Sequence, residues 1–157
     1  MENKILTTEF KVASFDELPT KDRELAELAR AATFRSYAPY SHFKVGAAIL
    51  LDNGKIIEGA NQENVAFPSG TCAERTACYY AHASCPDARF VKIAIAARGT
   101  DDNFVASHIA PCGACRQALL EYETLAGHDV EVLLCSADSV AVFPSVKSLL
   151  PLAFSEF

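Results

Sequence analysis

The succession of strand-like and helix-like segments constrains this chain more than any other feature. The triplet DNG at 52–54 predicts a tight turn, so the segments on either side form a hairpin. Helices placed between strands predict an α/β fold: a three-layer domain in which helices cover a mixed five-stranded sheet. In chain order we expect helix 21–35, strands 43–51 and 55–61, helix 72–84, strand 90–98, helix 110–123, strands 130–136 and 140–144, and a short helix at 145–151.

The length of 157 residues predicts one domain, 1–157, and 50% hydrophobic residues suffice for a sizeable core. Residues 1–20 form an N-terminal extension to which the sequence assigns no role. Within it, 8–15, TEFKVASF, is consistent with an extra edge strand or an extended arm.

The chain contains no apolar stretch of the kind found in secretory signals or membrane spans. The longest apolar run has about eight residues, against the roughly 20 that a spanning helix needs. We therefore expect a cytoplasmic protein that does not bind a membrane, in which cysteines are reduced, metal-bound or catalytic. With 14 basic and 20 acidic residues, the net charge is −6 and no basic run is present. This composition argues against nucleic acid as a partner.

Three cysteines lie where helices are expected to begin. Cys72 opens one helix, and Cys112 and Cys115, in PCGACRQ, open another. Helix N-termini present free N–H groups and partial positive charge, which favour thiolates. Two such helix starts facing each other would form a three-thiolate pocket, and zinc held by three protein ligands keeps a fourth position open, as catalytic zinc sites do.

Two other interpretations of these cysteines are less favoured. A closed structural zinc would need a fourth ligand, and Cys78, six residues after Cys72, faces another way on a helix of 3.6 residues per turn. A thioredoxin-like redox pair would use Cys112 and Cys115 and leave Cys72 unexplained. The remaining cysteines are expected to be buried free thiols: Cys78, Cys85 and Cys135.

Glu74, two residues after Cys72, gives the cysteines a chemical context. On its own it is an ordinary first-turn glutamate that favours the helix dipole. Cys-x-Glu followed about 40 residues later by Pro-Cys-x-x-Cys is the zinc deaminase signature in its all-cysteine form. In that signature the glutamate is not a ligand but moves protons.

From about Tyr40 to Phe154 the chain resembles cytidine deaminases of the small, three-cysteine, homotetrameric type. The matching segments occur in family order: YSHFKVGAAIL, NQENVAFPSGTCAERTA, APCGACRQALLE and LLPLAF. At Val65–Phe67 the chain departs from the small residue and tyrosine expected there. The resemblance implies the cytidine deaminase fold and a homotetramer with shared active sites.

The resemblance also implies a metal site and a catalytic group. It assigns Cys72, Cys112 and Cys115 as ligands of one Zn²⁺ per chain, Glu74 as the proton shuttle, and Arg75 as an arginine beside the thiolates. Hydroxide formed at the zinc would attack C4 of cytosine, and ammonia would leave. Cytidine and deoxycytidine would become uridine and deoxyuridine, a step of pyrimidine salvage.

The substrate contacts are likewise implied by the resemblance. Asn61 and Glu63 match residues that hydrogen-bond the ribose hydroxyls, and Phe43 matches an aromatic ring that packs on the pyrimidine. The backbone around Ala73 is expected to contact the base, and Phe154 to enter a neighbouring subunit's site. The Asn-x-Glu pair favours cytidine over blasticidin. An editing deaminase should be basic with histidine as first ligand, and a non-enzymatic zinc module would not need Glu74.

Overall fold

The computed structural model describes residues 1–155, so the last two residues of the predicted domain 1–157 lie outside it. Within the described range the strands are β1 (Lys11–Ser14), β2 (Lys44–Leu51), β3 (Ile56–Ala60), β4 (Phe90–Arg98), β5 (Glu131–Cys135) and β6 (Ser139–Phe143). The α-helices there are α1 (Thr20–Ala32), α2 (Ala73–Ser84) and α3 (Gly113–Ala126). Short 3₁₀ helices are η1 (Phe15–Glu17), η2 (Thr33–Arg35), η3 (Phe67–Ser69) and η4 (Lys147–Leu149). No helix among these residues is long and apolar enough to cross a membrane.

The strands of residues 1–155 form one mixed sheet in the order β1-β6-β5-β4-β2-β3. The pair β4–β5 is parallel and the other pairs are antiparallel. The prediction of five strands is wrong by one, because β1 pairs with β6 and adds a sixth strand at the edge. β1 lies within 8–15, the segment consistent with an edge strand or an extended arm, and the structure shows the strand. Four mostly exposed residues could not decide between the two, because the strand depends on pairing with a distant partner.

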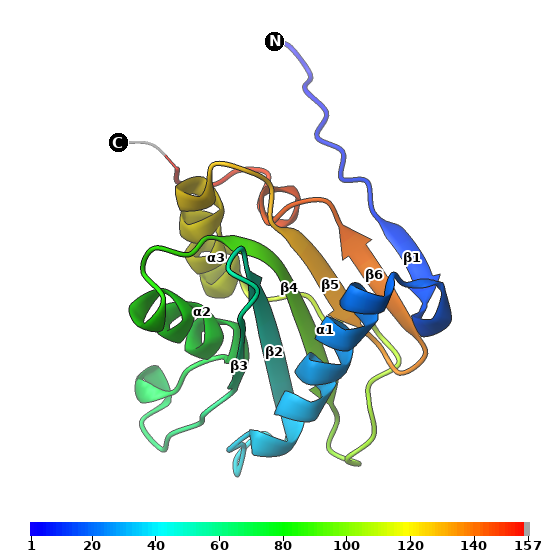
Figure 1. The fold of residues 1–157 in the computed structure, drawn as a ribbon, viewed down its shortest axis with the longest axis vertical. Helices are drawn as coiled ribbons and strands as arrows, with labels where there is room; N and C mark the ends of the chain where they lie inside the picture. Colours follow the sequence, from blue (N-terminus) through cyan, green and yellow to red (C-terminus); the bar gives the residue numbers. More distant parts are fainter. Residues whose placement is uncertain (156–157) are drawn as a thin grey trace.

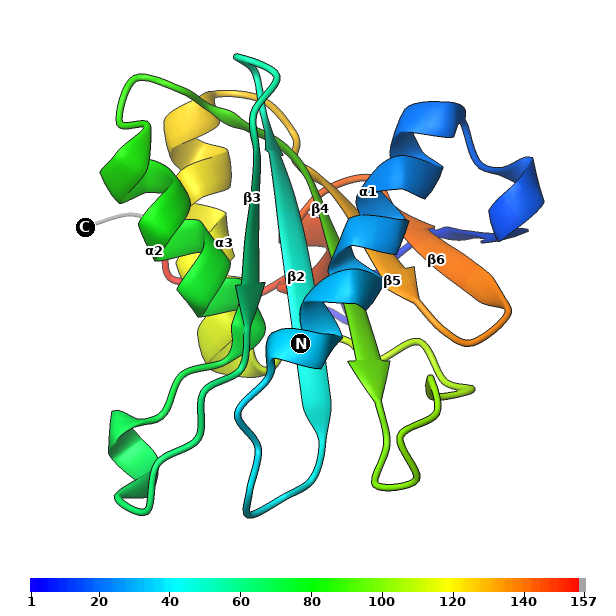
Figure 2. The ribbon, with the colours of Figure 1, turned by 60° about the horizontal axis from the view of Figure 1, so that its bottom comes forward.

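Helices cover both faces of the sheet, which confirms the three-layer α/β architecture. Figures 1 and 2 show α1 on one face and α2 with α3 side by side on the other. The pleat of β4 separates the two cores: Ile93 and Ile95 face α2 and α3, whereas Ala94 and Ala96 face α1. Small alanines on the second face let α1 approach closely.

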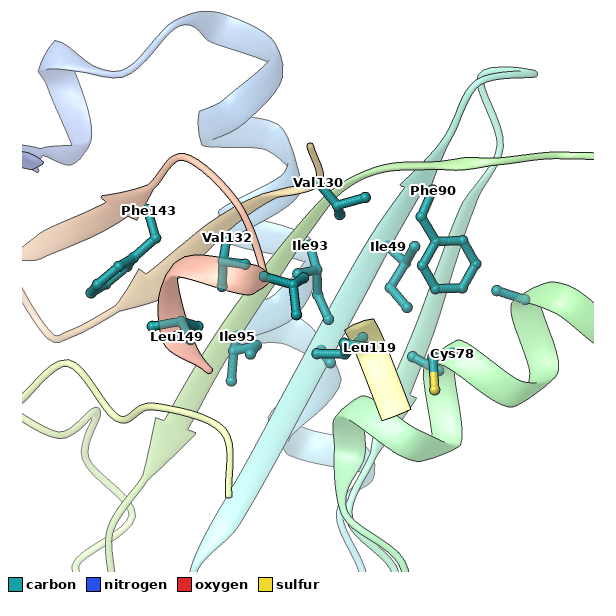
Figure 3. Close-up of a cluster of buried hydrophobic side chains, with 14 of the residues drawn as sticks. Ile49, Cys78, Phe90, Ile93, Ile95, Leu119, Val130, Val132, Phe143 and Leu149 are labelled. Carbon is teal, nitrogen blue, oxygen red and sulfur yellow. The ribbon is translucent and has the colours of Figure 1, made fainter. Parts of the chain in front are cut away.

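The larger core lies between the sheet and the α2–α3 layer. Figure 3 shows Ile49, Ile93 and Ile95 of the sheet pointing toward Leu119 of α3, beside Cys78 of α2. All of these side chains are buried. Burial of this kind fixes the two helices against the sheet, at about 25 cal/mol per Å² of apolar surface removed from water.

The turn signals of the sequence lie where the expected elements end. Gly54, in DNG, has φ +82° and closes the β2–β3 hairpin, and Gly127 has φ +71° and caps α3 in the left-handed conformation. The short helix expected at 145–151 is present only as the 3₁₀ turn η4, because a Pro-containing segment follows it.

Candidate active site

The first turns of α2 and α3 lie at the same end of the sheet for a topological reason. β2 is antiparallel to both β3 and β4, so β3 and β4 run in the same direction. α2 follows β3 and α3 follows β4, each on the same face of the sheet. Two helix N-termini, 40 residues apart in the chain, therefore meet beside the carboxyl ends of these strands (Figure 2).

The three predicted cysteines gather at these helix starts. Cys72 is the N-cap residue of α2, Cys112 is the N-cap residue of α3, and Cys115 is buried one turn further on. Among the described residues they form the one group of potential metal ligands within reach of a single ion, with sulfur atoms within 4.8 Å of one another. Cys78, Cys85 and Cys135 are free and lie outside this group.

The geometry of the sulfur atoms fits a zinc ion. Zn–S bonds of about 2.3 Å in tetrahedral geometry place two sulfurs roughly 3.8 Å apart. The Sγ atoms of Cys72 and Cys112 are 3.9 Å apart. Neither N-cap thiol accepts the usual capping hydrogen bond from its own helix, so both sulfurs are available to the cluster. Three soft sulfur ligands, of which Cys72 and Cys112 line the pocket, suit zinc with an open coordination position.

Local hydrogen bonds shift the pKa values of the cysteines in opposite directions. A hydrogen bond from Cys115, with support from Arg75, lowers the pKa of Cys72 to about 5. The same contact with Cys72, together with burial, raises the pKa of Cys115. Nη2 of Arg75 lies 3.7 Å from Sγ of Cys72, and this bond raises the pKa of Arg75, so the guanidinium stays charged. Arg75 thus lies beside the sulfur of Cys72.

Glu74 points into the same space from the first turn of α2. Its side chain is 5% exposed and lines the pocket next to Cys72 and Cys112. Burial raises the pKa of this carboxyl above its ordinary value. A carboxyl whose pKa lies closer to neutrality exchanges protons more readily with a reacting group at physiological pH.

A pocket of about 710 Å³ opens over the cluster, a size that suits a small organic ligand. The predicted residues Phe43, Asn61 and Glu63 line it together with Glu74 and the exposed side of the cysteines. Tyr40, Phe67, Thr71, Ile95, Ile109 and Ala110 also line it, and the sequence did not identify them.

Asn61 holds the segment that leads from Phe43 into β2. Its Nδ2 donates to the carbonyl of Phe43 at 2.9 Å, and its Oδ1 accepts from the N–H of Val45 at 2.8 Å and from Oγ of Ser36. The amide therefore pairs with the start of β2 as a neighbouring strand would. Both lone pairs of Oδ1 are used, which leaves one Nδ2 hydrogen to donate into the pocket.

Glu63 is held by the loop before Phe43. Its Oε2 accepts from the N–H groups of Tyr40 at 2.9 Å and Ser41 at 3.2 Å, and its Oε1 accepts from Oγ of Ser41. The Ser41 bond is the main cause of a lowered pKa at Glu63. The Ser41 hydroxyl also accepts from the N–H of Phe43 at 3.0 Å, so it links two predicted substrate contacts. Nothing in the sequence indicated that Ser41 would link Glu63 to Phe43.

Besides the buried Cys115, two predicted site residues lie outside the pocket lining. Ala73 is fully buried between Cys72 and Glu74, which both line the pocket. Phe154 is 71% exposed and lies outside the lining of this chain's own pocket. Within one chain, the candidate site therefore brings together the cysteines, Glu74, Arg75, Phe43, Asn61 and Glu63.

Comparison with known proteins identifies relatives over most of the chain. Residues 19–126 match the family model of the cytidine and deoxycytidylate deaminase zinc-binding region. A probable cytidine deaminase of Dictyostelium discoideum is 39% identical over 121 residues, which cover 77% of this chain and 75% of that protein. The cytidine deaminase of Halalkalibacterium halodurans is 38% identical over 120 residues, which cover 76% of this chain and 83% of that protein.

A solved structure shares the same architecture. The crystal structure of cytidine deaminase from Burkholderia pseudomallei superposes with a TM-score of 0.69 at 40% sequence identity. The match covers 83% of this chain and 97% of that one.

Proposed function

This chain belongs to the cytidine and deoxycytidylate deaminase family, and from that premise we propose that it hydrolyses cytidine and deoxycytidine to uridine and deoxyuridine with release of ammonia. The observation that carries the proposal is the meeting of three cysteine sulfurs with the buried Glu74 at the floor of one pocket. We also propose that the reaction serves pyrimidine salvage in the cytoplasm.

Cys72, Cys112 and Cys115 would hold one Zn²⁺ per chain. Zinc bound in this way supplies a water molecule whose pKa is lowered toward neutrality. Three thiolates exceed the charge of the cation by one, and this excess would weaken that effect. Arg75 and the two helix N-termini offset it, because each directs positive charge at the sulfurs.

Glu74 is the group that moves protons in this proposal. It accepts one proton of the attacking water and passes it to N3 of the cytosine ring. It then takes the remaining proton from the hydroxyl formed at C4 and delivers it to the amine, so that the C–N bond breaks, ammonia leaves and C4 becomes a carbonyl. Its burial supports this role, because the raised pKa lets the carboxyl hold a proton between these steps. The apolar neighbours Phe43 and Ile95 line the same pocket and limit access of other water molecules.

Asn61 and Glu63 offer complementary groups to a ribose hydroxyl. Asn61 has one N–H left to donate, and the Oε1 of Glu63 keeps one lone pair beyond its bond with Ser41. Both residues line the same pocket, and in this proposal one ribose hydroxyl accepts from Asn61 and donates to Glu63. A substrate without that hydroxyl would leave both groups unpaired, so free cytosine should be rejected strongly.

The same proposal includes a homotetramer with shared active sites. Phe67 and Tyr40 at the pocket rim are 77% and 48% exposed, and Tyr79 and Tyr80 on α2 are 51% and 62% exposed. Exposed aromatic side chains of this number favour burial against another copy. In such an assembly Phe154 would complete the pocket of a neighbouring chain.

The test is the loss of cytosine absorbance when purified protein meets cytidine, deoxycytidine, free cytosine or blasticidin, with zinc measured by mass spectrometry. We expect turnover of both nucleosides, none of free cytosine, and about one zinc per chain. Glu74→Gln should lose activity and keep its zinc. Turnover of blasticidin alone would overturn the substrate, and an unimpaired Glu74→Gln variant would overturn the catalytic role.

A further inference from the structure

Glu123 is a buried carboxylate that the proposed reaction does not use. It lies near the end of α3 and is 7% exposed. Its Oε2 accepts from the N–H groups of Val130 at 2.9 Å and Val146 at 2.7 Å, and its Oε1 accepts from the N–H of Lys147 at 3.0 Å. Burial of a carboxylate costs free energy unless hydrogen bonds satisfy it. A buried carboxylate that is fully hydrogen-bonded, as here, fixes one arrangement of the backbone segments that it binds.

The bonds to Val146 and Lys147 hold the beginning of the last segment of the chain, residues 146–154, here called the C-terminal strap. Two further side chains of α3 hold the strap. Nη1 of Arg116 donates to the carbonyl of Leu149 at 2.7 Å, and Nε2 of Gln117 donates to the carbonyl of Phe154 at 2.7 Å. The three anchors thus come from one helix.

The order of the anchors gives the strap a direction. Its start is bound at Glu123, near the end of α3, and its end is bound at Gln117, near the beginning. The strap therefore runs back along α3 toward the cysteines. In Figure 2 the red end of the chain lies beside α3, on the side of the molecule that carries α2.

Arg116 ties the strap to the metal-binding end of the helix. Its Nε donates to the carbonyl of Pro111 at 2.8 Å, immediately before Cys112, while its Nη1 binds Leu149. One planar guanidinium with fixed donor directions thus spans the backbone before the cysteine and the backbone of the strap. If either backbone segment moved, its hydrogen bond to Arg116 would break, and the two segments would no longer be linked.

The outward side chains of the strap are the groups that this anchoring positions. Leu152 is 84% exposed and Phe154 is 71% exposed, although the Phe154 carbonyl is bound to α3. We propose that Glu123, Arg116 and Gln117 are positioning residues that fix the strap along the cysteine-bearing helix, and so set where Phe154 meets the nucleoside site of a second copy. This inference rests on the proposed function, since it concerns the neighbour's pocket.

The test compares two variants with the same substitution on the same helix. Glu123→Gln keeps the size of the side chain but presents an NH₂ group to backbone donors, whereas Glu121→Gln changes an exposed glutamate. We expect Glu123→Gln to raise KM for cytidine about fivefold, the order of effect for one lost ordinary hydrogen bond. Its kcat and zinc content should stay within about twofold of the parent, since Phe154 contributes uniform binding. Glu121→Gln should behave as the parent.

A double-mutant cycle separates positioning from general destabilisation. If Glu123 acts through Phe154, the KM effect of Glu123→Gln should vanish in a Phe154→Ala background. Equal effects in both backgrounds, or a fall in kcat with loss of zinc, would overturn the inference. Should Glu123→Gln fail to fold, Gln117→Ala at a half-buried position replaces it in the cycle.

The activity of the parent protein distinguishes failure of the proposed function from failure of the anchoring. If the parent does not convert cytidine, the proposed function and the role of Phe154 both fail. If the parent is active and the strap amides of Val146 and Lys147 exchange hydrogen equally fast in the parent and in Glu123→Gln, only the anchoring fails.

Discussion

Replacement of Gly59 by alanine should displace α2 and, with it, the residues of the candidate site in the first turn of this helix. A Cβ at Gly59, on β3, would lie 2.6 Å from the carbonyl oxygen of Ala73 and 2.6 Å from the amide nitrogen of Ala77. Both atoms belong to the backbone of α2, so no side-chain rotation can relieve the overlap. The helix itself has to move.

The size of this movement can be worked from the contact distances. Ordinary van der Waals contact begins at 3.4 Å, so the α2 backbone would have to retreat by about 0.8 Å. Overpacking of this kind costs about 1–3 kcal/mol of unfolding free energy. Ala73 lies between Cys72 and Glu74, so both groups move with it, and a displacement near 1 Å at a reacting site can lower turnover by about 100-fold.

Gly46→Ala provides a matched control on the neighbouring strand β2. Its Cβ would lie 2.3 Å from the carbonyl oxygen of Ala29 and 2.6 Å from the amide nitrogen of Thr33, at α1 on the opposite face of the sheet. Both variants should melt at lower temperature, by about 2–4 °C per kcal/mol for a chain of this size. Only Gly59→Ala should lose zinc and turnover per folded molecule.

Calorimetry, zinc content and cytidine turnover below the melting transition measure these effects. Full activity of folded Gly59→Ala would refute the reasoning, because the first turn of α2 would then tolerate the displacement. Equal losses of turnover in the two variants would also refute it, because α1 does not contribute to the pocket.

Three further perturbations have defined outcomes. Arg75→Ala should lower turnover about tenfold and release zinc faster to a chelator, and unchanged kinetics and metal content would contradict this role. Burial acts to lower the pKa of Lys92, but its bonds to Asp22 and Glu131 raise it overall. The stabilisation by Lys92 is therefore complete below the pKa of lysine in the unfolded chain, about 10.4, and is lost as pH rises through the higher pKa of the folded state. Measured by urea unfolding, the free energy of unfolding should fall less at alkaline pH in Lys92→Met than in the parent. Burial raises the pKa of Cys135 to about 12, so a disulfide reagent at pH 8 should modify it only after unfolding, and rapid labelling of the native protein would contradict this.

Local patterns sufficed for most elements of the fold. The helical spacing at 21–35 and the apolar run at 90–98 predicted α1 and β4, whose bounds are Thr20–Ala32 and Phe90–Arg98. Such patterns are readable because a helix or buried strand is set by residues close in sequence. β1 was not fixed in this way, since its four residues become a strand only by pairing with β6.

The sequence by itself determined the chemical groups of the site. Cysteines at two helix starts and a glutamate two residues after the first were sufficient to predict a metal-binding cluster with a carboxyl beside it, because their spacing relative to the helix starts can be read locally. Only the tertiary structure decided that the sulfurs lie within 4.8 Å of one another, that the side-chain amide of Asn61 is hydrogen-bonded to the backbone at the start of β2, and that Glu123 binds the C-terminal strap. These contacts join residues that are far apart in the chain, and their geometry depends on how strands pair and helices pack.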